Sequence, residues 1–399
     1  MKRVFLLFPA VLLFLSSDII TVENMSAGFP PVDKLPEIKE LPDPFLMFNG
    51  RRVRTLKDWE KRREEIKAML LYYQFGSMPP APGNMTAKVL RSSSSRRGVE
   101  LSMGPEKKVK LRLRMYIPKG KGPFPAIVWN VGTYTAKPSY HPIGQALSRG
   151  YILVQYNRED LDRDGSLNEP GPAQAAYPGY EWRCLAVWAW GGMRVIDYLF
   201  TLPEVDKKKI AVTGHSRGGG TALLLGAFDE RVALTVPNAG GVAGAASYRY
   251  IRKGFTHHDP KWCFAHPRSD HCHPRAFTFA TKEKIFRLPF DGHTIKSLVA
   301  PRALVTINGM TDKIMDPLGV QNTNLAAKVV YDWLGAGDKL GWNFRPGGHA
   351  QGKEDWAALL DYADLIFFKK KPESGRKFDT LPFPDKKPPF SWKAPPKIK

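Results

Sequence analysis

The spacing of apolar residues alternates along the chain between short strand-like runs and longer segments of helical period. Strands are predicted at 109–117, 126–131, 152–156, 210–213, 233–236, 303–307 and 342–345. Helices are predicted at 57–73, 182–202, 221–228, 324–334 and 353–368. This alternation predicts an α/β fold whose mainly parallel central sheet is covered by helices on both faces, a three-layer sandwich. Sites in such sheets form at the C-terminal ends of the strands.

The two ends of the chain depart from this pattern. Lys2 and Arg3 precede an almost wholly apolar stretch over 4–15, which predicts a signal peptide at 1–20. That stretch is shorter than the roughly 20 residues of a membrane span, so we expect a secreted or periplasmic protein without a stable membrane span after cleavage. An uncleaved anchor is the alternative. Residues 370–399 are rich in Lys and Pro and predict a basic, extended tail that packs weakly or is partly disordered.

The formal net charge of +22 indicates attraction to polyanions. No aromatic-rich nucleic-acid module is recognisable, so we expect an acidic polysaccharide as partner and no nucleic acid. Three cysteines, Cys184, Cys263 and Cys272, allow at most one disulfide, so stability must come from the core. Nothing in the sequence predicts the oligomeric state.

The first candidate for chemistry is the run Gly214-His215-Ser216-Arg217-Gly218, which fits the pattern G-x-S-x-G. It follows a predicted strand and precedes a predicted helix, which is the context of a nucleophile elbow. The turn is sharp, and glycine at its flanks avoids crowding. We therefore predict an α/β-hydrolase fold with Ser216 as nucleophile. The alternatives are a glycine-rich turn without chemistry and a phosphate-binding loop.

The base and the acid should follow the nucleophile along the chain, in the order acid and then histidine. His349 comes after a glycine pair and between a predicted strand and helix, so it is the predicted base, with His293 as its rival. Asp312 follows the strand at 303–307 and is the predicted acid that orients the imidazole, with Asp316 as the alternative. His215 adjoins the nucleophile, and its side chain is expected to point away.

The oxyanion hole is expected on the other side of the nucleophile. The backbone N–H of Arg217 is the first predicted donor, because it follows Ser216 directly. The second is expected near Gly132 and Thr133, after the strand at 126–131. The side chain of Arg217 is a candidate for an added positive charge, and a surface arginine paired with a carboxylate is the alternative.

From about Leu41 to Phe367 the chain resembles the glucuronoyl esterases, also called 4-O-methyl-glucuronoyl methylesterases. The matching stretches are Leu41–Phe45 with Asn49-Gly50 and Trp59, Gly214–Arg217, Phe228–Ala233, and Leu288–His293 with Ala300–Arg302. The resemblance implies a catalytic domain over 28–369, including its N-terminal lead-in. It also implies cleavage of the ester between glucuronic acid on xylan and lignin alcohols, without metal or cofactor.

Three positions bear on the match to this family. Many members carry Glu where this chain has Ala239, and Lys where it has Gly220, the Lys contacting the uronate. Some members place the acid on the later loop instead, which favours Asp312. Trp262 resembles a family tryptophan that lines the sugar site, with core packing as the alternative.

The remaining histidines and cysteines between 257 and 273 could suggest zinc, but they lack paired Cys-x-x-Cys spacing, and we predict no metal. Three functions therefore stay open. The first is a glucuronoyl esterase. The second is an acetyl xylan esterase or general carboxylesterase with the same triad. The third is a non-catalytic glycan-binding protein with a hydrolase fold, against which the retained Ser216 and His349 argue.

Overall fold

The computed structural model describes residues 28–132, 141–164, 169–241, 244–256, 261, 264 and 271–396. The predicted signal peptide at 1–20, Thr133 and Trp262 lie outside the described residues. Among the helices of the described part, none is both long and apolar enough to cross a membrane.

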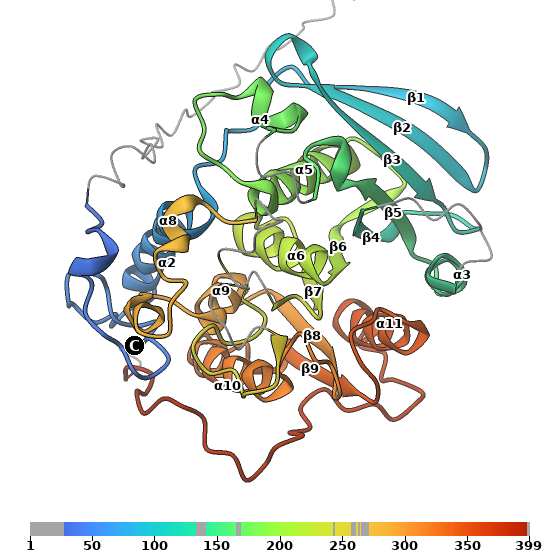
Figure 1. The fold of residues 1–399 in the computed structure, drawn as a ribbon. Helices are drawn as coiled ribbons and strands as arrows, with labels where there is room; N and C mark the ends of the chain where they lie inside the picture. The colour runs from blue at the N-terminus through green and yellow to red at the C-terminus, as the bar shows by residue number, and fades with distance from the viewer. Residues whose placement is uncertain are drawn as a thin grey trace, which may run out of the picture.

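A nine-stranded sheet forms the centre of the molecule (Figure 1). Its strands are β1 (Thr86–Ser92), β2 (Arg96–Met103), β3 (Val109–Tyr116), β4 (Phe124–Val131), β5 (Ile152–Asn157), β6 (Val205–His215), β7 (Leu234–Asn238), β8 (Ala303–Gly309) and β9 (Leu340–Arg345). Their order across the sheet is β1-β2-β3-β5-β4-β6-β7-β8-β9. The pairs β1–β2, β2–β3 and β3–β5 are antiparallel, and all other neighbouring strands are parallel. The predicted fold class is confirmed.

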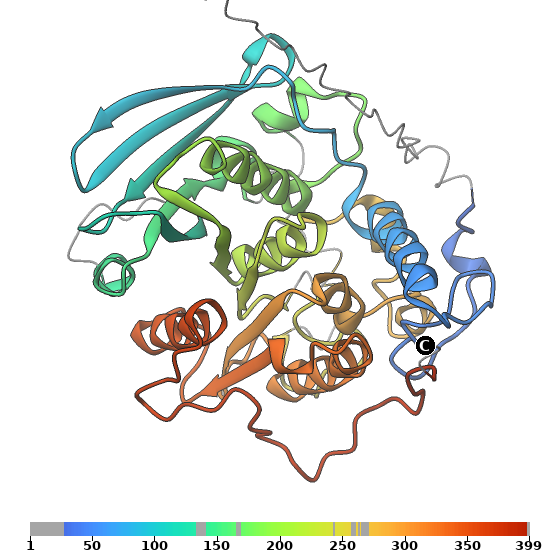
Figure 2. The same cartoon turned by 180° about the vertical axis from the view of Figure 1, so that it is seen from behind.

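Helices pack on both faces of this sheet (Figures 1 and 2). The α-helices are α2 (Leu56–Leu70), α3 (His141–Ser148), α4 (Pro172–Ala176), α5 (Cys184–Leu199), α6 (Arg217–Phe228), α8 (Pro274–Phe277), α9 (Gly292–Val299), α10 (Pro317–Trp333) and α11 (Lys353–Phe368). A π-turn, η2 (Leu71–Phe75), continues α2, and short 3-10 turns occupy η1 (Val32–Lys34), η3 (Pro105–Lys107), η4 (Arg158–Asp160), η7 (Lys284–Arg287) and η8 (Gly337–Lys339).

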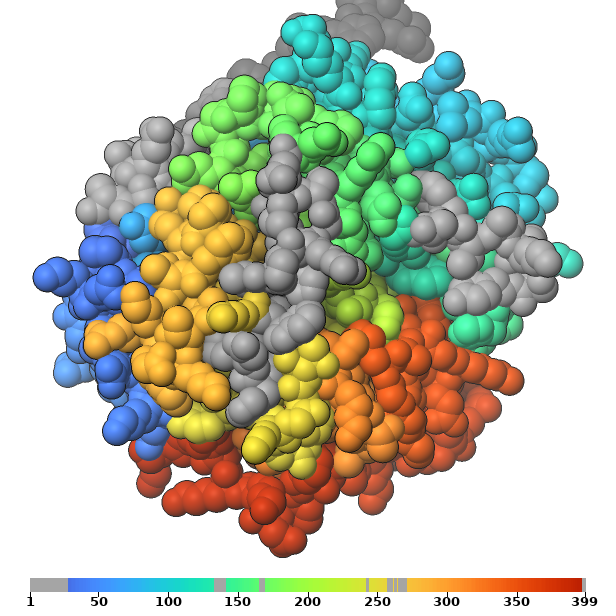
Figure 3. All heavy atoms as spheres, in the orientation of Figure 1, coloured from blue at the N-terminus to red at the C-terminus, as the bar shows by residue number. Residues whose placement is uncertain are grey.

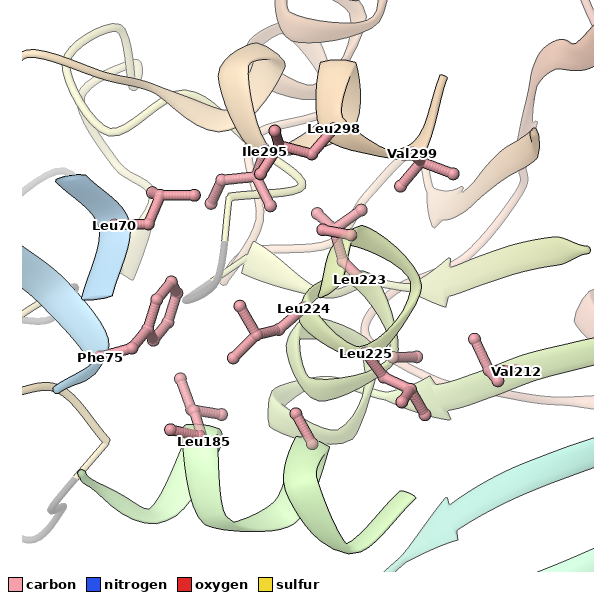
Figure 4. Packing of buried hydrophobic residues seen from close by; sticks show 14 of the residues in the cluster. Leu70, Phe75, Leu185, Val212, Leu223, Leu224, Leu225, Ile295, Leu298 and Val299 are labelled. Atoms are coloured by element: carbon pink, nitrogen blue, oxygen red, sulfur yellow. The ribbon is translucent and has the colours of Figure 1, made fainter. Parts of the chain in front are cut away.

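The strand pattern divides the core into two clusters, one on each face. In β4, Val128 belongs to the larger cluster and its neighbour Ile127 to the smaller one, because successive side chains point to opposite faces. The larger cluster includes α5, α6 and α9, and the smaller one includes α3 and α11. Figure 4 shows Leu223 and Leu224 of α6 at the centre of the larger cluster. The core thus fixes α6, the helix that begins at the predicted nucleophile.

The C-terminal tail is extended, as expected, but the expectation of weak packing is wrong. It runs along the surface of the molecule and ends near the N-terminal lead-in (Figures 1 and 3). The backbone oxygen of Phe378 accepts a 2.8 Å hydrogen bond from the Trp342 N–H. The indole of Trp392 donates a 2.7 Å hydrogen bond to the Leu41 oxygen. Aromatic side chains among the Lys and Pro residues supply apolar area that composition alone understates.

Candidate active site

Ser216 lies in a sharp turn between β6 and α6. Its backbone has φ 55° and ψ −121°, a conformation that side chains rarely adopt and that is typical of functional turns. A Cβ added to Gly214 would lie 2.3 Å from the Gly218 oxygen, so this crossing of strand and helix requires glycine. The Ser216 N–H donates a 3.0 Å hydrogen bond to the Asn238 oxygen and ties the turn to β7. The predicted nucleophile therefore occupies a strained turn at the C-terminal edge of the sheet.

His349 and Asp312 come together at the same edge. His349 Nδ1 lies 2.8 Å from Asp312 Oδ2. A carboxylate only accepts, so Nδ1 carries the proton and Nε2 of the neutral ring keeps its lone pair. Such a histidine can accept a proton from a serine hydroxyl.

Asp312 is fully buried and still favours its charged form. Burial alone would raise the pKa of its carboxyl group. The hydrogen bond from His349 and those from the Met315 and Ile314 N–H groups outweigh burial, so the pKa is lowered from its usual 3.8. Asp312 is therefore an anion suited to orient and stabilise a histidine cation.

The two rival residues serve the fold. Asp316 caps α10 through the Leu318 N–H and pairs with Arg252. His293 is fully buried, and its Nε2 lies 2.7 Å from the Pro42 oxygen in the lead-in. Burial lowers the pKa of His293 to about 3.

His215 lies against the predicted base. The ring centroids of His215 and His349 are 4.5 Å apart, with the planes tilted by 45°. His215 Nδ1 lies 2.8 Å from Asn238 Oδ1, and the Asn238 amide donates to Asp355. Asn238 Oδ1 is thus an acceptor, so His215 Nδ1 carries the proton. Burial lowers the pKa of His215 and keeps its ring neutral beside His349.

Asp355 anchors this neutral ring to the helix behind it. The carboxylate of Asp355 accepts 2.7 Å hydrogen bonds from the Arg345 Nε and a further one from the Gly352 N–H. The network of His215, Asn238 and Asp355 was not predicted from the sequence. The only signal for this network was a histidine beside the nucleophile and an asparagine at the end of the next strand.

A cationic cluster lies on the other side of Ser216. The Arg217 guanidinium donates a 2.6 Å hydrogen bond to Asp164, and Arg158 and His271 approach the same carboxylate at 3.5 and 3.2 Å. Arg217 thus forms the expected carboxylate pair, yet 41% of its side chain stays exposed. Burial would raise the pKa of Asp164, but the hydrogen bond from His271 and the charge of Arg217 lower it. Asp164 therefore holds this cluster as an anion.

Arg158 lies between the two predicted parts of the oxyanion hole. A Cβ added to Gly132 would come within 3.1 Å of its guanidinium, and one added to Gly218 within 3.0 Å. The guanidinium also donates to the Asn130 side chain and lies 4.5 Å from the Trp188 ring. Arg158 was not predicted from the sequence, although its position two residues after a predicted strand was a usable signal.

Gly220 and Ala239 both lie beneath the elbow. The Gly220 N–H donates to the Ser216 oxygen, and the Ala239 N–H donates to Ile307 in β8. Both residues are buried, and neither carries a charge. Two guanidinium groups lie close to the elbow: Arg217 follows Ser216 directly, and Arg158 approaches Gly218.

Part of the histidine and cysteine cluster lies within the described residues. His271 contacts Asp164, His273 approaches Glu181 at 3.3 Å, and Cys272 is buried. No group of three metal-ligating side chains occurs in the described part of the chain. The cluster's other members lie outside it.

A strained serine elbow and a carboxylate-paired histidine at the edge of a mostly parallel sheet define the α/β-hydrolase class. Residues 101–335 match a family model described as "Glucuronyl esterase, fungi". The chain belongs to the glucuronoyl esterase family.

Individual relatives agree with this membership. A 4-O-methyl-glucuronoyl methylesterase of Cerrena unicolor is 28% identical over 325 residues, which are 78% of this chain and 65% of that relative. The chain thus spans about two thirds of that relative's length. A carbohydrate esterase family 15 glucuronoyl esterase from Caldicellulosiruptor kristjansonii has a TM-score of 0.77 at 28% identity, covering 91% of this chain and 99% of that one.

A serine-to-alanine variant of the Sporotrichum thermophile glucuronoyl esterase shares the fold. Its TM-score is 0.69 at 24% identity, covering 88% of this chain and 94% of that one. That protein was solved in complex with methyl 4-O-methyl-β-D-glucopyranuronate.

Proposed function

We propose that this protein is a serine carboxylic-ester hydrolase that cleaves glucuronoyl esters of the xylan–lignin type. The observation that carries the proposal is the 2.8 Å contact of His349 with Asp312, beside a strained serine elbow in a chain of this family. The glucuronate ester bound by the Sporotrichum thermophile relative is the substrate class that we extend to this chain.

The reaction proceeds in two halves. Ser216 Oγ attacks the ester carbonyl carbon while its proton passes to His349 Nε2, and Asp312 stabilises the imidazolium. The tetrahedral intermediate collapses, the alcohol leaves with the proton from His349, and an acyl group remains on Ser216. Water, deprotonated by His349, attacks this acyl group and releases the uronic acid. Serine regains its proton.

The negative charge of the tetrahedral intermediate develops next to the start of α6. The Arg217 N–H is the donor that the elbow offers, and the backbone near Gly132 is the second candidate. The helix N-terminus favours negative charge there. The guanidinium groups of Arg217 and Arg158 add two permanent cations to this side, which supports turnover of an anion-forming substrate.

The test compares benzyl glucuronate with p-nitrophenyl acetate, using wild type and Ser216→Ala. We expect Ser216-dependent hydrolysis of the glucuronate, with kcat reduced by about 10³-fold or more in the variant. Full activity of Ser216→Ala would contradict the mechanism.

A second candidate is an acetyl esterase or general carboxylesterase. Gly220 and Ala239 favour it, because neither can contact a uronate through a charged side chain. The same measurement separates the two functions. Cleavage of the acetate alone supports the second candidate.

Export is part of the proposal, because the proposed substrate is an extracellular polymer. Residues 1–20 carry the features of a signal peptide. Intact mass and N-terminal sequencing of secreted protein should find a start between about 17 and 27. A secreted chain that still begins at Met1 would contradict cleavage.

A further inference from the structure

One face of the antiparallel strands β1–β3 is strongly basic. In β3 the side chains of Val109, Leu111 and Leu113 are buried, while those of Lys110 and Arg112 between them are exposed. Paired residues share a face, so the strand register defines the outer face. Its side chains are Lys88, Arg91, Arg96, Glu100, Ser102, Lys110, Arg112, Arg114 and Tyr116. This outer face therefore carries six cations and one carboxylate.

The outer face is also hollowed. Arg91 and Arg114 both stand opposite Gly98 in the strand register. A Cβ added to Gly98 would approach nothing closer than 3.9 Å, so open space lies above it. A hollow of about 650 Å³ forms here, and its lining includes Arg91, Arg96 and Arg114. The Arg96 guanidinium lies 5.3 Å from the Tyr116 ring centroid at one end.

A second hollow adjoins the first. It measures about 680 Å³, and Arg112 lines both hollows. Its lining is mixed in charge, because Glu100, Glu159, Asp160 and Glu169 stand among the cations. Arg112 donates to Asp160 of η4, and Asp160 follows Arg158 by two residues. Arg158 shares Asp164 with Arg217, the neighbour of Ser216. Alternating cations and carboxylates thus connect Arg112, at the border of the basic hollow, with Arg217 at the active-site edge.

The chemistry of the first hollow, whose lining holds arginines and no carboxylate, fits one kind of partner. Arginine recognises carboxylates through paired N–H donors, and cations set along a groove suit a linear chain with spaced carboxylates. Single-stranded nucleic acid would call for exposed stacking platforms, whereas Tyr116, the aromatic side chain of this face, is only 1% exposed. Basic residues also protect an edge strand such as β1 from pairing, but that role does not require the hollow.

We propose that the outer face of β1–β3 binds a polysaccharide chain through its free uronate carboxylates and so presents the esterified uronate of the same chain to Ser216. This inference rests on the proposed function for the identity of the polymer. Figures 1 and 2 show β1 and β2 projecting past the helices at one end of the sheet, where a long polymer can reach them.

The test measures binding without turnover, with Ser216→Ala in every protein. The probes are glucuronoxylan freed of its esters and the same xylan stripped of uronates, compared by affinity electrophoresis. The groove variant is Arg91→Gln/Arg96→Gln/Arg114→Gln. The matched control is Lys371→Gln/Lys386→Gln/Lys387→Gln, which removes three exposed charges from the tail. Gly98→Glu is a second variant that introduces an acid into open space.

We expect the groove variant and Gly98→Glu to lose about tenfold in affinity for the uronate-bearing xylan, which corresponds to three weak ion pairs. The control should bind like the parent, and 0.5 M salt should weaken parental binding. Equal losses in the groove and control variants, or unchanged binding by both groove variants, would overturn the proposal. Duplex DNA is a further probe. A groove variant that loses binding to DNA but keeps its affinity for the polysaccharide would also overturn the proposal.

Kinetics with active Ser216 separate this inference from the proposed function. On esterified glucuronoxylan the groove variant should show a raised KM and an unchanged kcat. On benzyl glucuronate both constants should match wild type. If wild type cleaves no glucuronate ester, the proposed function fails, while the binding experiment still decides whether β1–β3 holds a polyuronate chain.

Discussion

The two flanks of Ser216 are built from different chemistry. On the His349 flank, two imidazole rings meet, and Asp312 is the carboxylate bonded to the base. On the Arg217 flank, two guanidinium groups and His271 surround Asp164. Proton transfer needs a group whose proton position is fixed and whose charge can change. Stabilisation of an oxyanion needs positive charge that is already in place before the negative charge develops.

The hydrogen-bond partners maintain this difference. Burial lowers the pKa of His215, so this ring does not repel the imidazolium that forms on His349. Asp164 stays ionised through His271 and Arg217, so the opposite flank keeps its charges. Substitutions on the first flank should therefore act on proton transfer, and those on the second on charge stabilisation.

Asp312→Asn should have the largest effect. The amide cannot stabilise the imidazolium and permits the wrong tautomer of His349, so kcat should fall by about 10³- to 10⁴-fold. Initial rates on benzyl glucuronate measure this. Asp316→Asn is the control, because Asp316 caps α10 and should affect thermal stability more than kcat. Equal losses of kcat in both variants would show that the acid assignment is wrong.

Arg217→Gln should have the next largest effect. Removing the guanidinium leaves the Arg217 backbone N–H in place but takes a cation from the oxyanion side, so kcat should fall by about 10- to 100-fold. The pH dependence of kcat should keep its shape, because the His349 flank is unchanged. A displaced acid limb would instead place Arg217 within the proton-transfer system.

His215→Ala should lower kcat by roughly three- to tenfold, since it removes a ring that supports His349 but takes no part in the proton transfer. His215→Phe restores the ring face without the link to Asn238, and should recover part of the loss. The ratio of the two kcat values measures how much the contact between ring 215 and the His349 ring contributes. Identical losses would assign the effect to the hydrogen bond with Asn238.

The smallest expected effect is on stability at low pH. The pKa of Asp312 is lowered in the folded state, so its contribution is complete above its usual pKa of 3.8 and is lost as pH falls through the lower folded value. Urea unfolding between pH 3 and 7 should show a steeper acid loss for wild type than for Asp312→Asn. Parallel curves would contradict the lowered pKa.

The sequence predicted the features that depend on local pattern. Each of the seven predicted strands overlaps one of β3–β9, and the elbow stands out because its glycines are adjacent in the chain. His349 and Asp312 could be predicted from the sequence because each lies in a loop that follows an apolar strand. Choosing Asp312 over Asp316 required geometry, since the two lie only four positions apart and both carboxylates are buried.

Other features depend on distant contacts that leave no local signal. Asp164 meets Arg217 across 53 positions and His271 across 107. β1 was missed because all seven of its residues are exposed, which removes the apolar alternation that marks a strand. The tail was expected to pack weakly because its composition hid the contacts of Trp392 and Phe378 with the domain.

Covalent labelling by a fluorophosphonate, mapped by mass spectrometry, is the most direct test of Ser216 as the nucleophile. We expect one adduct on Ser216 of wild type, none on Ser216→Ala, and much slower labelling of His349→Ala, with loss of glucuronate ester hydrolysis in step with the adduct. An adduct on another residue, or an unlabelled protein that still hydrolyses the ester, would contradict Ser216 as the nucleophile.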